Sequence, residues 1–376
     1  MAWSPWRVLI GLLPVLLCLA PERQADAGPT QITVMTQNLY TGADTNPILM
    51  AATIPDLQNA IKAATQSVID NNFPLRATAI AAEAVKAGGP LLIGLQEAEI
   101  VGQAGVTLNY ADAVITALKA QGLNYTYTIP GVGSTVHTGL SLDSATAGLP
   151  GFVTLTDQDV VLVRTDVPGF TVKSVSAPTF ANPGTAQSPL FGQISLQRGY
   201  VLVDATLDGV PLQFVSTHLD GGLTSAEPAE INEILTGLGT TGQPQLVVGD
   251  FNATRSDLCT GLLCGPAELL AAGFTDTGAG LGPTCCQSPD LSNPASMLDR
   301  EYDYIFERGF SSVDLAALIG NQPVENVRPL WPSDHAGVVA TLTEVPEPAA
   351  AALLMSAIFL FGAVRLRGRT QRYNSP

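Results

Sequence analysis

Polar residues of a few types recur at the ends of apolar runs in this 376-residue sequence. They stand at Gln37-Asn38, Gln96-Glu97, Ser216-Thr217-His218, Gly249-Asp250-Phe251-Asn252 and Ser333-Asp334-His335, and Asp303 lies inside a further run. Carboxylates, amides and imidazoles can bind metal ions or phosphate oxygens and can move protons. A single polar ending is common by chance. Because the pattern repeats and uses two of the three histidines, it predicts a site where strands end along one edge of a sheet.

The elements that must position these residues are runs rich in Val, Ile, Leu and Thr, which alternate with alanine-rich stretches. The predicted strands are Gln31–Leu39, Pro90–Glu97, Gln158–Arg164, Gly199–Leu207, Val210–Leu219, Pro244–Asn252, Glu301–Phe306 and Ala336–Thr343. The predicted helices are Asn46–Val68, Pro74–Ala87, Leu108–Gln121, Glu227–Leu238 and Cys264–Ala272.

Two segments set the connections between these elements. The Asp208-Gly209 pair between two runs predicts a two-residue hairpin, so at least one pair of strands is antiparallel and the sheets are mixed. Segment Gly131–Phe191 is rich in Gly, Pro, Ser and Thr and has little periodicity. We interpret it as long surface loops around one strand.

Six motifs, in order along the chain, carry a resemblance to a known family. They are Met35-Thr36-Gln37-Asn38-Leu39-Tyr40, Leu95-Gln96-Glu97, Ser216-Thr217-His218, Gly249-Asp250-Phe251-Asn252, Tyr302-Asp303-Tyr304-Ile305 and Ser333-Asp334-His335. From Thr33 to Thr341 the sequence resembles the endonuclease/exonuclease/phosphatase superfamily. The resemblance implies one α/β (α+β) domain, a four-layer αββα sandwich of two mixed sheets flanked by helices, and hydrolysis of phosphoesters.

The resemblance also implies a divalent metal ion. Glu97, a hard carboxylate at a strand end, is the expected ligand for Mg²⁺ (magnesium) or Mn²⁺. Asn38 would supply an amide oxygen and Asp334 a second carboxylate.

The remaining motif residues are expected to be catalytic. His335 resembles the general base and Asp303 its orienting partner, while His218 resembles the histidine that contacts the phosphoryl oxygen and helps the leaving group. Asp250 and Asn252 would approach the phosphate and the water. Whether Asp250 is instead the base, or a ligand of a second metal, stays open. Relatives also carry a mid-chain phosphate contact, for which Arg164 is preferred over Arg198.

The composition limits the function classes. Charged residues make up 13% and hydrophobic residues 46% of the chain, which excludes a charge-rich disordered protein. The formal charge of −16 argues against nucleic-acid binding through a broad basic surface. Three histidines and five cysteines are too few for an array of zinc fingers.

Both ends of the chain have the composition of targeting segments. Arg7, an apolar run and a small-residue site ending at Ala27 predict a secretory signal over residues 1–27; an N-terminal membrane anchor is the alternative. The second segment covers residues 346–376. Here the motif Val345-Pro346-Glu347-Pro348 is followed by an apolar span at about 349–364 and an arginine-rich tail. This end resembles a PEP-CTERM sorting signal, which implies an exosortase as processing partner. An ordinary tail anchor is the alternative.

The exported domain would span residues 28–345. Without residues 1–27 and 349–376 the chain keeps 11 Lys and Arg against 31 Asp and Glu, a formal charge of −20. We expect a monomer exported across the inner membrane of a Gram-negative bacterium, held at the membrane by its C-terminal segment until processing. Its destination would be the cell surface or the extracellular matrix.

Four cysteines fall close together, at Cys259, Cys264, Cys285 and Cys286. In an oxidising compartment we expect two local disulfides, with all three pairings open. A zinc site is the alternative, although adjacent cysteines lack the usual spacer.

The leading hypothesis is a secreted, metal-dependent phosphodiesterase, most simply an extracellular nuclease acting on DNA or RNA. A sphingomyelinase-like enzyme or a phosphodiesterase or phosphatase for small molecules is the first alternative. The second is a non-catalytic surface or matrix protein on the same fold.

Overall fold

A computed structural model describes residues 30–103, 106–127, 134–136, 153–221, 226–324 and 328–344. The predicted signal peptide and the C-terminal sorting segment lie outside these residues. In the described part of the chain, no helix combines the length and the apolar character needed to cross a membrane.

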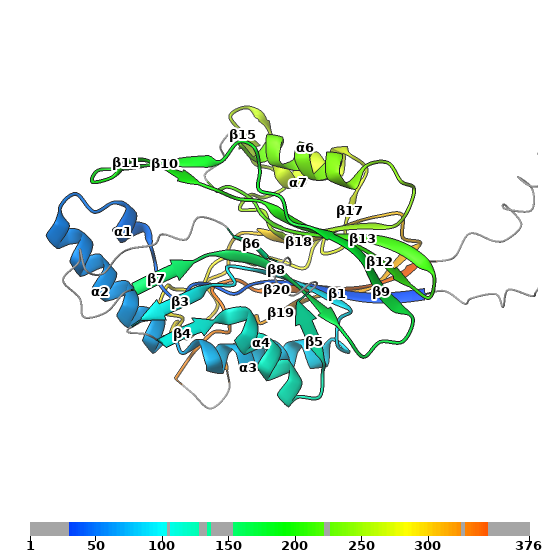
Figure 1. The fold of residues 1–376 in the computed structure, drawn as a ribbon, viewed down its shortest axis with the longest axis horizontal. Helices are drawn as coiled ribbons and strands as arrows, with labels where there is room; N and C mark the ends of the chain where they lie inside the picture. The colour runs from blue at the N-terminus through cyan, green and yellow to red at the C-terminus, as the bar shows by residue number, and fades with distance from the viewer. Residues whose placement is uncertain are drawn as a thin grey trace, which may run out of the picture.

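Two large mixed sheets form the centre of the molecule (Figure 1). The first has the order β19-β20-β1-β2-β8-β5, with β6 also paired to β8. Its strands are β1 (Thr30–Asn38), β2 (Leu92–Gln96), β5 (Tyr125–Tyr127), β6 (Ser134–Val136), β8 (Gln158–Arg164), β19 (Ser312–Ile319) and β20 (Gly337–Glu344).

The second sheet has the order β17-β18-β14-β13-β12-β9. Its strands are β9 (Phe170–Ser176), β12 (Tyr200–Leu207), β13 (Val210–His218), β14 (Gln245–Asp250), β17 (Thr275–Asp276) and β18 (Asp303–Arg308). Strands β12 and β13 form the predicted hairpin, with Asp208 and Gly209 both at positive φ in the turn.

Helices cover the outer face of each sheet, which gives four layers (Figure 1). The helices are α1 (Asn46–Leu49), α2 (Ile54–Asp70), α3 (Phe73–Lys86), α4 (Tyr110–Ala120), α6 (Ala226–Leu238) and α7 (Gly265–Ala271). Helices α3 and α4 pack on the first sheet, and α6 and α7 on the second. The predicted αββα sandwich is therefore confirmed.

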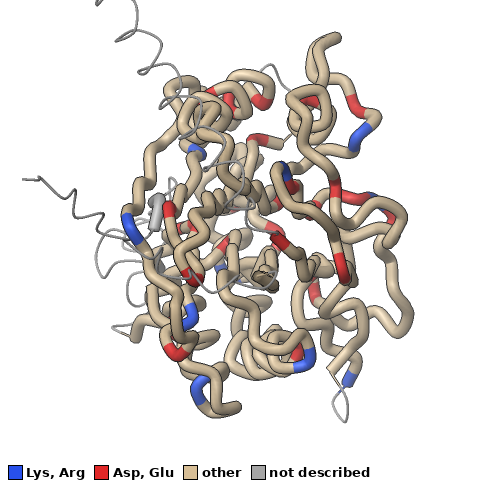
Figure 2. The backbone as a smooth tube through the Cα atoms, turned by 90° about the vertical axis from the view of Figure 1, so that its right-hand side faces the viewer, with Lys and Arg blue, Asp and Glu red and all other residues tan. Residues whose placement is uncertain are grey.

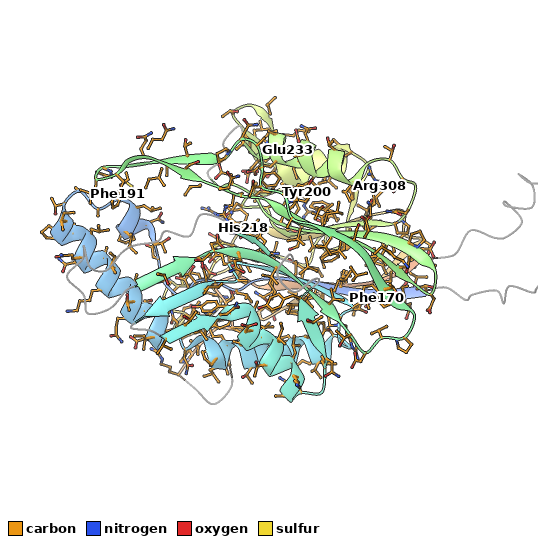
Figure 3. All side chains as sticks on the ribbon, viewed as in Figure 1. Phe170, Phe191, Tyr200, His218, Glu233 and Arg308 are labelled. Carbon is orange, nitrogen blue, oxygen red and sulfur yellow. A yellow bond between two sulfur atoms is a disulfide. The ribbon has the colours of Figure 1, made fainter. Side chains whose placement is uncertain are left out.

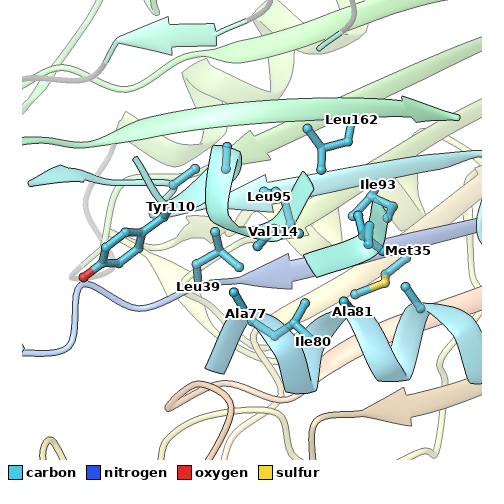
Figure 4. Packing of buried hydrophobic residues seen from close by; sticks show 14 of the residues in the cluster. Met35, Leu39, Ala77, Ile80, Ala81, Ile93, Leu95, Tyr110, Val114 and Leu162 are labelled. Atoms are coloured by element: carbon cyan, nitrogen blue, oxygen red, sulfur yellow. The ribbon is translucent and has the colours of Figure 1, made fainter. Parts of the chain in front are cut away.

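Helix α3 shows how the sequence builds the outer layers. Its buried residues recur at three- and four-residue steps, so that one face is apolar and the other meets water. Figure 4 shows this face against the sheet. The contacting residues are Ala77, Ile80 and Ala81 of α3, Tyr110 and Val114 of α4, and Met35, Ile93, Leu95 and Leu162 of the sheet.

A second apolar core fills the space between the sheets. Val34, Leu92 and Val161 of the first sheet belong to one cluster with Phe214 and Val248 of the second. Central strands buried on both faces read as continuous apolar runs, which explains why their positions could be predicted within a few residues.

Some predicted elements are corrected by the structure. Asn46–Val68 is not one helix but two, because Thr53 adopts an extended conformation and accepts the Asp56 N–H as the N-cap of α2. The predicted helix Leu108–Gln121 begins only at Tyr110, after strand β4 (Val106–Asn109), with Asn109 as its N-cap.

The interpretation of Gly131–Phe191 as loops around a single strand is wrong. Besides β8, its described residues contain β6, β7 (Val153–Thr156), β9 and β10 (Gly184–Ser188). Strand β7 pairs with β3 (Ile100–Gln103), which also pairs with β4 (Val106–Asn109). These strands lie at edges or in small sheets, and the alternation of half-buried and exposed residues in β9 is short and is interrupted at Ser174, where the register with β12 shifts.

Strand β10 forms a separate two-stranded ribbon with β11 (Gly192–Leu196). A smaller hairpin joins β15 (Leu258–Cys259) to β16 (Leu262–Leu263). Two local disulfides are present, as predicted, and they pair Cys259 with Cys264 and Cys285 with Cys286.

Candidate active site

The first sheet brings two of the motifs to one edge. Strands β1 and β2 are parallel, and their last residues Asn38 and Gln96 pair, so that Glu97 follows directly beyond this edge. Strand β20 runs antiparallel to β1 and begins just after His335. The start of β20 and the ends of β1 and β2 therefore meet at the same place.

The second sheet contributes three more residues at the corresponding edge. His218 and Asp250 are the last residues of the parallel strands β13 and β14, and they are paired. Asp303 begins the antiparallel strand β18 and is paired with Asp250. Figure 3 shows His218 between the two large sheets.

The backbone bends sharply where the strands end. Glu97 has a φ of 48° and Asn252 a φ of 51°, in the left-handed region of backbone conformation that residues other than glycine rarely adopt. Gly249 has a φ of 147°, and a Cβ added there would lie 1.9 Å from the carbonyl oxygen of Thr217. Only glycine therefore fits before Asp250, which explains the glycine of the Gly249-Asp250-Phe251-Asn252 motif.

The Asp250 carboxylate lies at the centre of the site and is 1% exposed. Its Oδ1 accepts the backbone N–H of Asn252 at 2.8 Å, and its Oδ2 accepts the side-chain amide of Asn38 at 2.9 Å. The same Oδ2 lies 3.5 Å from His218 Nε2 and 3.7 Å from His335 Nδ1. Burial raises the pKa of Asp250, although His335 and these hydrogen bonds oppose the shift.

His335 and Asp303 form a buried pair, with Nδ1 of the imidazole 2.7 Å from Oδ2 of the carboxylate. Burial alone would lower the pKa of His335, but Asp303, Asp250 and Asp334 outweigh it and raise that pKa well above its usual value. Burial raises the pKa of Asp303 to about 6 against the opposing effect of His335. The other ring nitrogen, Nε2, lies 3.7 Å from Cys286 Sγ.

His218 is held by Arg198, whose Nη1 lies 2.5 Å from His218 Nδ1. Because a guanidinium only donates hydrogen bonds, Nδ1 is the acceptor of this bond. The other ring nitrogen, Nε2, lies 2.9 Å from the amide nitrogen of Asn252, which also donates to the carbonyl oxygen of Leu219 at 3.1 Å. His218 therefore points Nε2 toward the centre of the site, 3.5 Å from Asp250 Oδ2.

The predicted metal ligands lie next to these pairs. Glu97 accepts the side-chain amide of Asn38 through Oε1 at 3.1 Å and the backbone N–H of Thr41 through Oε2 at 3.0 Å. Burial, together with the charges of Glu97 and Asp250, raises the pKa of Asp334 to about 7. Carboxylate oxygens crowded in this way are the donor set of a hard divalent cation such as Mg²⁺.

Asn38 differs from the expected arrangement. Its amide oxygen accepts the backbone N–H of Tyr40 at 2.8 Å, while its NH₂ group donates to both Glu97 and Asp250. In this structure Asn38 therefore links the two carboxylates and does not present its oxygen beside them.

Arg164 is not part of the site, contrary to the prediction. It ends β8, which runs antiparallel to β2, and so lies at the opposite edge of the sheet. Its guanidinium donates to Asp166 at 2.7 Å and to the carbonyl oxygen of Gly89 at 2.7 Å. Arg198, the second candidate in the sequence, is the arginine that reaches His218.

Arg76 supports the site and was not predicted. This fully buried guanidinium on α3 donates to the carbonyl oxygens of Leu39 at 2.6 Å, Tyr40 at 3.0 Å and Pro332 at 3.0 Å. It thereby ties the loop after β1 to the segment that carries Asp334. In the sequence, Arg76 is a basic residue early in an alanine-rich helix, and that pattern is too common to mark it as a residue that supports the site.

Glu99 is a second residue that the sequence reasoning missed. It is 2% exposed and accepts the hydroxyl of Thr41 at 2.7 Å, while the same hydroxyl lies 3.3 Å from Glu97. Burial, with the charges of Asp157 and Glu97, raises the pKa of Glu99 well above its usual value. The repeated acid in Glu97-Ala98-Glu99 was the available signal.

Comparisons with known proteins agree with this architecture at the level of the fold. No protein-family model matches the sequence, and no curated protein has a significant match to it. An endonuclease/exonuclease/phosphatase family protein from Bacteroides thetaiotaomicron superimposes with a TM-score of 0.52 at 18% identity, covering 84% of this chain and 96% of that one.

Two further solved structures are similar. A mannosyl-6-phosphatase from Bacteroides thetaiotaomicron has a TM-score of 0.52 at 17% identity, covering 83% of this chain and 99% of that one. The endonuclease/exonuclease/phosphatase from Bacteroides vulgatus has a TM-score of 0.51 at 16% identity, covering 84% and 100%. The chain therefore has the fold of the endonuclease/exonuclease/phosphatase proteins.

Proposed function

We propose that this protein is a divalent-metal-dependent hydrolase of phosphoesters. The observation that carries the proposal is the position of the Asp250 carboxylate, which lies within 4 Å of a nitrogen of both His218 and His335. Each imidazole has a second partner, Arg198 or Asp303, that orients it. A buried acid between two oriented imidazoles can bind a phosphoryl group and move protons to and from it.

The residues present fit a magnesium ion. Glu97 and Asp334 would hold it, and the charges of Glu97 and Asp250 both act on Asp334 and raise its pKa. Bound there, Mg²⁺ would neutralise charge on the phosphoryl oxygens and offset the repulsion between the carboxylates.

His335 is the better candidate for the general base. Both oxygens of Asp250 already accept hydrogen bonds from Asn252 and Asn38, which lowers its capacity to take a proton from water. His335 directs Nδ1 to Asp303 and leaves Nε2 to accept the proton. Asp303 orients the ring and stabilises its protonated form.

His218 has a different role because Arg198 holds its Nδ1 and its Nε2 faces the Asp250 carboxylate. When it carries a proton, Nε2 can donate to a phosphoryl oxygen and stabilise the charge that develops there. Asn252, whose amide lies 2.9 Å from the same nitrogen, can contact the same phosphoryl group.

Within this class, the sequence favours an extracellular nuclease for DNA or RNA. A hydrolase of small phosphoesters is the second candidate, and the charge distribution supports it. Figure 2 shows Lys and Arg scattered singly along the described backbone and not gathered in a patch. The mannosyl-6-phosphatase with a similar fold acts, by its name, on a sugar phosphate.

The location of the protein is part of the proposal. The signal-like N-terminus and the PEP-CTERM-like C-terminus favour export, transient anchoring in the membrane and processing by an exosortase-type enzyme. The two disulfides fit an oxidising compartment.

The test is a hydrolysis assay of a chain spanning Gly28–Glu344 on linear DNA, RNA, sphingomyelin and a chromogenic phosphodiester, with Mg²⁺ and with EDTA. Glu97→Ala and His335→Ala are assayed beside it. We expect EDTA-sensitive cleavage of at least one substrate, reduced about 10³-fold or more in both variants.

The outcomes separate the candidates. Cleavage of one substrate class identifies the subclass. No cleavage of any substrate by a folded protein would favour the non-catalytic alternative. Equal activity in EDTA would contradict the metal dependence.

A further inference from the structure

The β10–β11 ribbon extends from the second sheet beside helices α1 and α2 (Figure 1). Its tip residue Leu190 packs against the apolar cluster of Ile48, Ala51, Leu57 and Ile61, which belongs to α1, α2 and the residues between them. Phe191, the next residue, lies beside α1 in Figure 3. We call the ribbon and its contact with α1 and α2 the strap.

The base of the ribbon is fixed next to the site. Gly184 lies so close to Asp220 that an added Cβ would be 2.2 Å from its Oδ1, and Asp220 is only two residues beyond His218. The backbone N–H of Ala181 donates to the Glu233 carboxylate of α6 at 3.1 Å. Arg198, just after the ribbon, contacts His218.

The two faces of the ribbon differ, as expected for a segment held against the protein. Gly184, Ala186, Ser188, Ile194 and Leu196 alternate along one face and are buried or half-buried. Thr185, Gln187, Gln193 and Ser195 form the other face and are exposed. A free two-stranded ribbon would expose both faces and would be marginally stable.

The strap therefore connects the two sides of the site. Helices α1 and α2 follow β1, which ends at Asn38, and the ribbon leads into Arg198 beside His218. Because Leu190 joins the tip of the ribbon to α1 and α2, the ribbon and these two helices together reach from one side of the catalytic edge to the other, and we call them the frame. The catalytic side chains inside it are buried, with Asp250 1%, His218 2% and His335 6% exposed.

The frame also lacks the charges that nucleic acid requires. No residue from Thr179 to Gln197 is charged, and α1 and α2 together carry Asp56, Asp70 and only one basic residue, Lys62. Proteins that bind a nucleic-acid backbone line the path with Lys and Arg, because these side chains neutralise the phosphates. A rigid duplex would find here a frame with one basic side chain on α1, α2 and the ribbon, around buried catalytic groups.

We propose that the strap restricts this enzyme to small phosphoesters with an uncharged organic group and excludes the internal phosphodiester bonds of duplex nucleic acid. This inference rests on the proposed function and selects the second of its substrate classes. The contact of Leu190 with the α1–α2 cluster carries it.

The test compares the full chain with two charge-insertion variants of the ribbon. Leu190→Asp places a charge in the apolar contact, and Gln193→Asp places the same charge on the exposed face as a matched control. Each protein is assayed with Mg²⁺ on p-nitrophenyl phosphate, bis(p-nitrophenyl) phosphate and supercoiled plasmid DNA. Hydrogen exchange of residues 184–196 reports release of the ribbon.

We expect the wild type to hydrolyse at least one nitrophenyl ester and to cleave plasmid at least about tenfold less efficiently. Leu190→Asp should speed hydrogen exchange in the ribbon. Half-burial of a leucine changes an equilibrium constant about tenfold, so the ribbon should be released about ten times more often. We therefore expect the ratio of plasmid cleavage to ester hydrolysis to rise about tenfold. Gln193→Asp should change neither quantity.

Three results would overturn the inference. They are plasmid cleavage by the wild type as efficient as ester hydrolysis, an unchanged substrate ratio after the ribbon is released, or unchanged hydrogen exchange in Leu190→Asp. If Leu190→Asp does not fold, replacement of Gly184–Leu196 by a short Gly-Ser linker repeats the comparison. Absence of any Mg²⁺-dependent hydrolysis in the wild type would instead contradict the proposed function, and hydrogen exchange would still test the anchoring of the strap.

Discussion

Two groups of buried carboxylates lie close to the same edge of the sandwich, and their surroundings differ. In the first, Asp250 and Asp303 face the imidazoles of His218 and His335. In the second, Glu227 and Glu230 of α6 are both 0% exposed and accept the backbone N–H groups of Gly265 and Asp220. Among the described residues, one oxygen of each of these glutamates has no hydrogen-bond partner.

The comparison shows two ways to bury an acid. Burial raises the pKa of Asp250 and Asp303, but the His335 imidazole opposes the shift, so that charge and protons are shared within the cluster. Burial raises the pKa of Glu227 to about 8 and that of Glu230 to about 7. The first group can therefore exchange protons with a substrate, whereas in the second Glu227 is mainly protonated at neutral pH and Glu230 is partly protonated.

The largest effect is expected from Asp303→Asn, which breaks the pair that distinguishes the first group. The amide cannot stabilise a protonated His335 and can turn the ring into the wrong tautomer, so kcat should fall about 10³-fold or more. Steady-state kinetics on the best substrate measures this. Asp314→Asn, an exposed residue of the edge strand β19, is the matched control and should leave kcat unchanged. A loss below tenfold in Asp303→Asn would contradict the assignment of His335 as the base.

The next effect separates the two arginine candidates. Arg198→Ala removes the group that holds His218 through Nδ1, and we expect kcat/KM to fall about 10- to 100-fold. Arg164→Ala breaks only contacts at the opposite edge and should leave kcat/KM unchanged.

Arg198 also lies beside Asp157, so its removal can weaken the fold. Arg198→Lys keeps a positive charge, and in this variant we expect the pH dependence of kcat to change while the unfolding midpoint is retained. Equal losses of kcat/KM in the Arg198 and Arg164 variants would show that neither arginine acts through the site.

Strand direction separates these two arginines, and the sequence alone does not give strand direction. Arg164 is the last residue of β8, and Arg198 lies two residues before β12. Because β8 runs antiparallel to β2, Arg164 lies at the edge of the sheet opposite to the residues that follow Gln96. The six motifs themselves could be placed, since central strands read as apolar runs and their polar ends stand out. The structure brings Asn38, Glu97, His218, Asp250 and His335 together as that pattern required.

The elements that the sequence did not reveal share a different property. Strands β9, β10, β11 and β19 lie at edges or in the ribbon and expose many residues, so their short stretches of alternating or apolar residues are weaker signals than the runs of the central strands. The strap depends on one tertiary contact, that of Leu190, which no local pattern encodes. Arg76 likewise gains its role only when three carbonyl groups from distant segments meet around it.

A stability measurement tests the second group of acids. Because folding raises the pKa of Glu227 and Glu230 above 4.5, their contribution to stability is complete below about pH 4.5 and is lost as the pH rises through about 7 and 8. The free energy of unfolding should therefore decrease between pH 5 and pH 8.5. The loss is at most about 1.4 kcal/mol for each unit of pKa shift.

The double variant Glu227→Gln/Glu230→Gln cannot ionise at these two positions and should make this decrease smaller. It should match the wild type near pH 5 and exceed its stability at pH 8.5 by up to several kcal/mol. Urea unfolding in EDTA at both pH values measures the difference. If the two proteins lose stability in parallel, the glutamates are not the groups that titrate.

The smallest effect concerns the disulfide that borders the second group. Cys264 is the N-cap residue of α7, and the next residue, Gly265, donates its N–H to Glu227 at 3.4 Å. The Cys259–Cys264 bond closes a loop with a sequence separation of 5, so Cys259→Ser/Cys264→Ser should lower the free energy of unfolding by about 2 kcal/mol.

Cys285 and Cys286 are adjacent and enclose no chain loop, so their bond should contribute almost no loop-closure entropy. Dithiothreitol should therefore destabilise the wild type by about as much as the double substitution does, and should add little in the variant. A large further loss in the variant would show that the pair beside His335, and not the loop beside Glu227, is the bond that stabilises the fold.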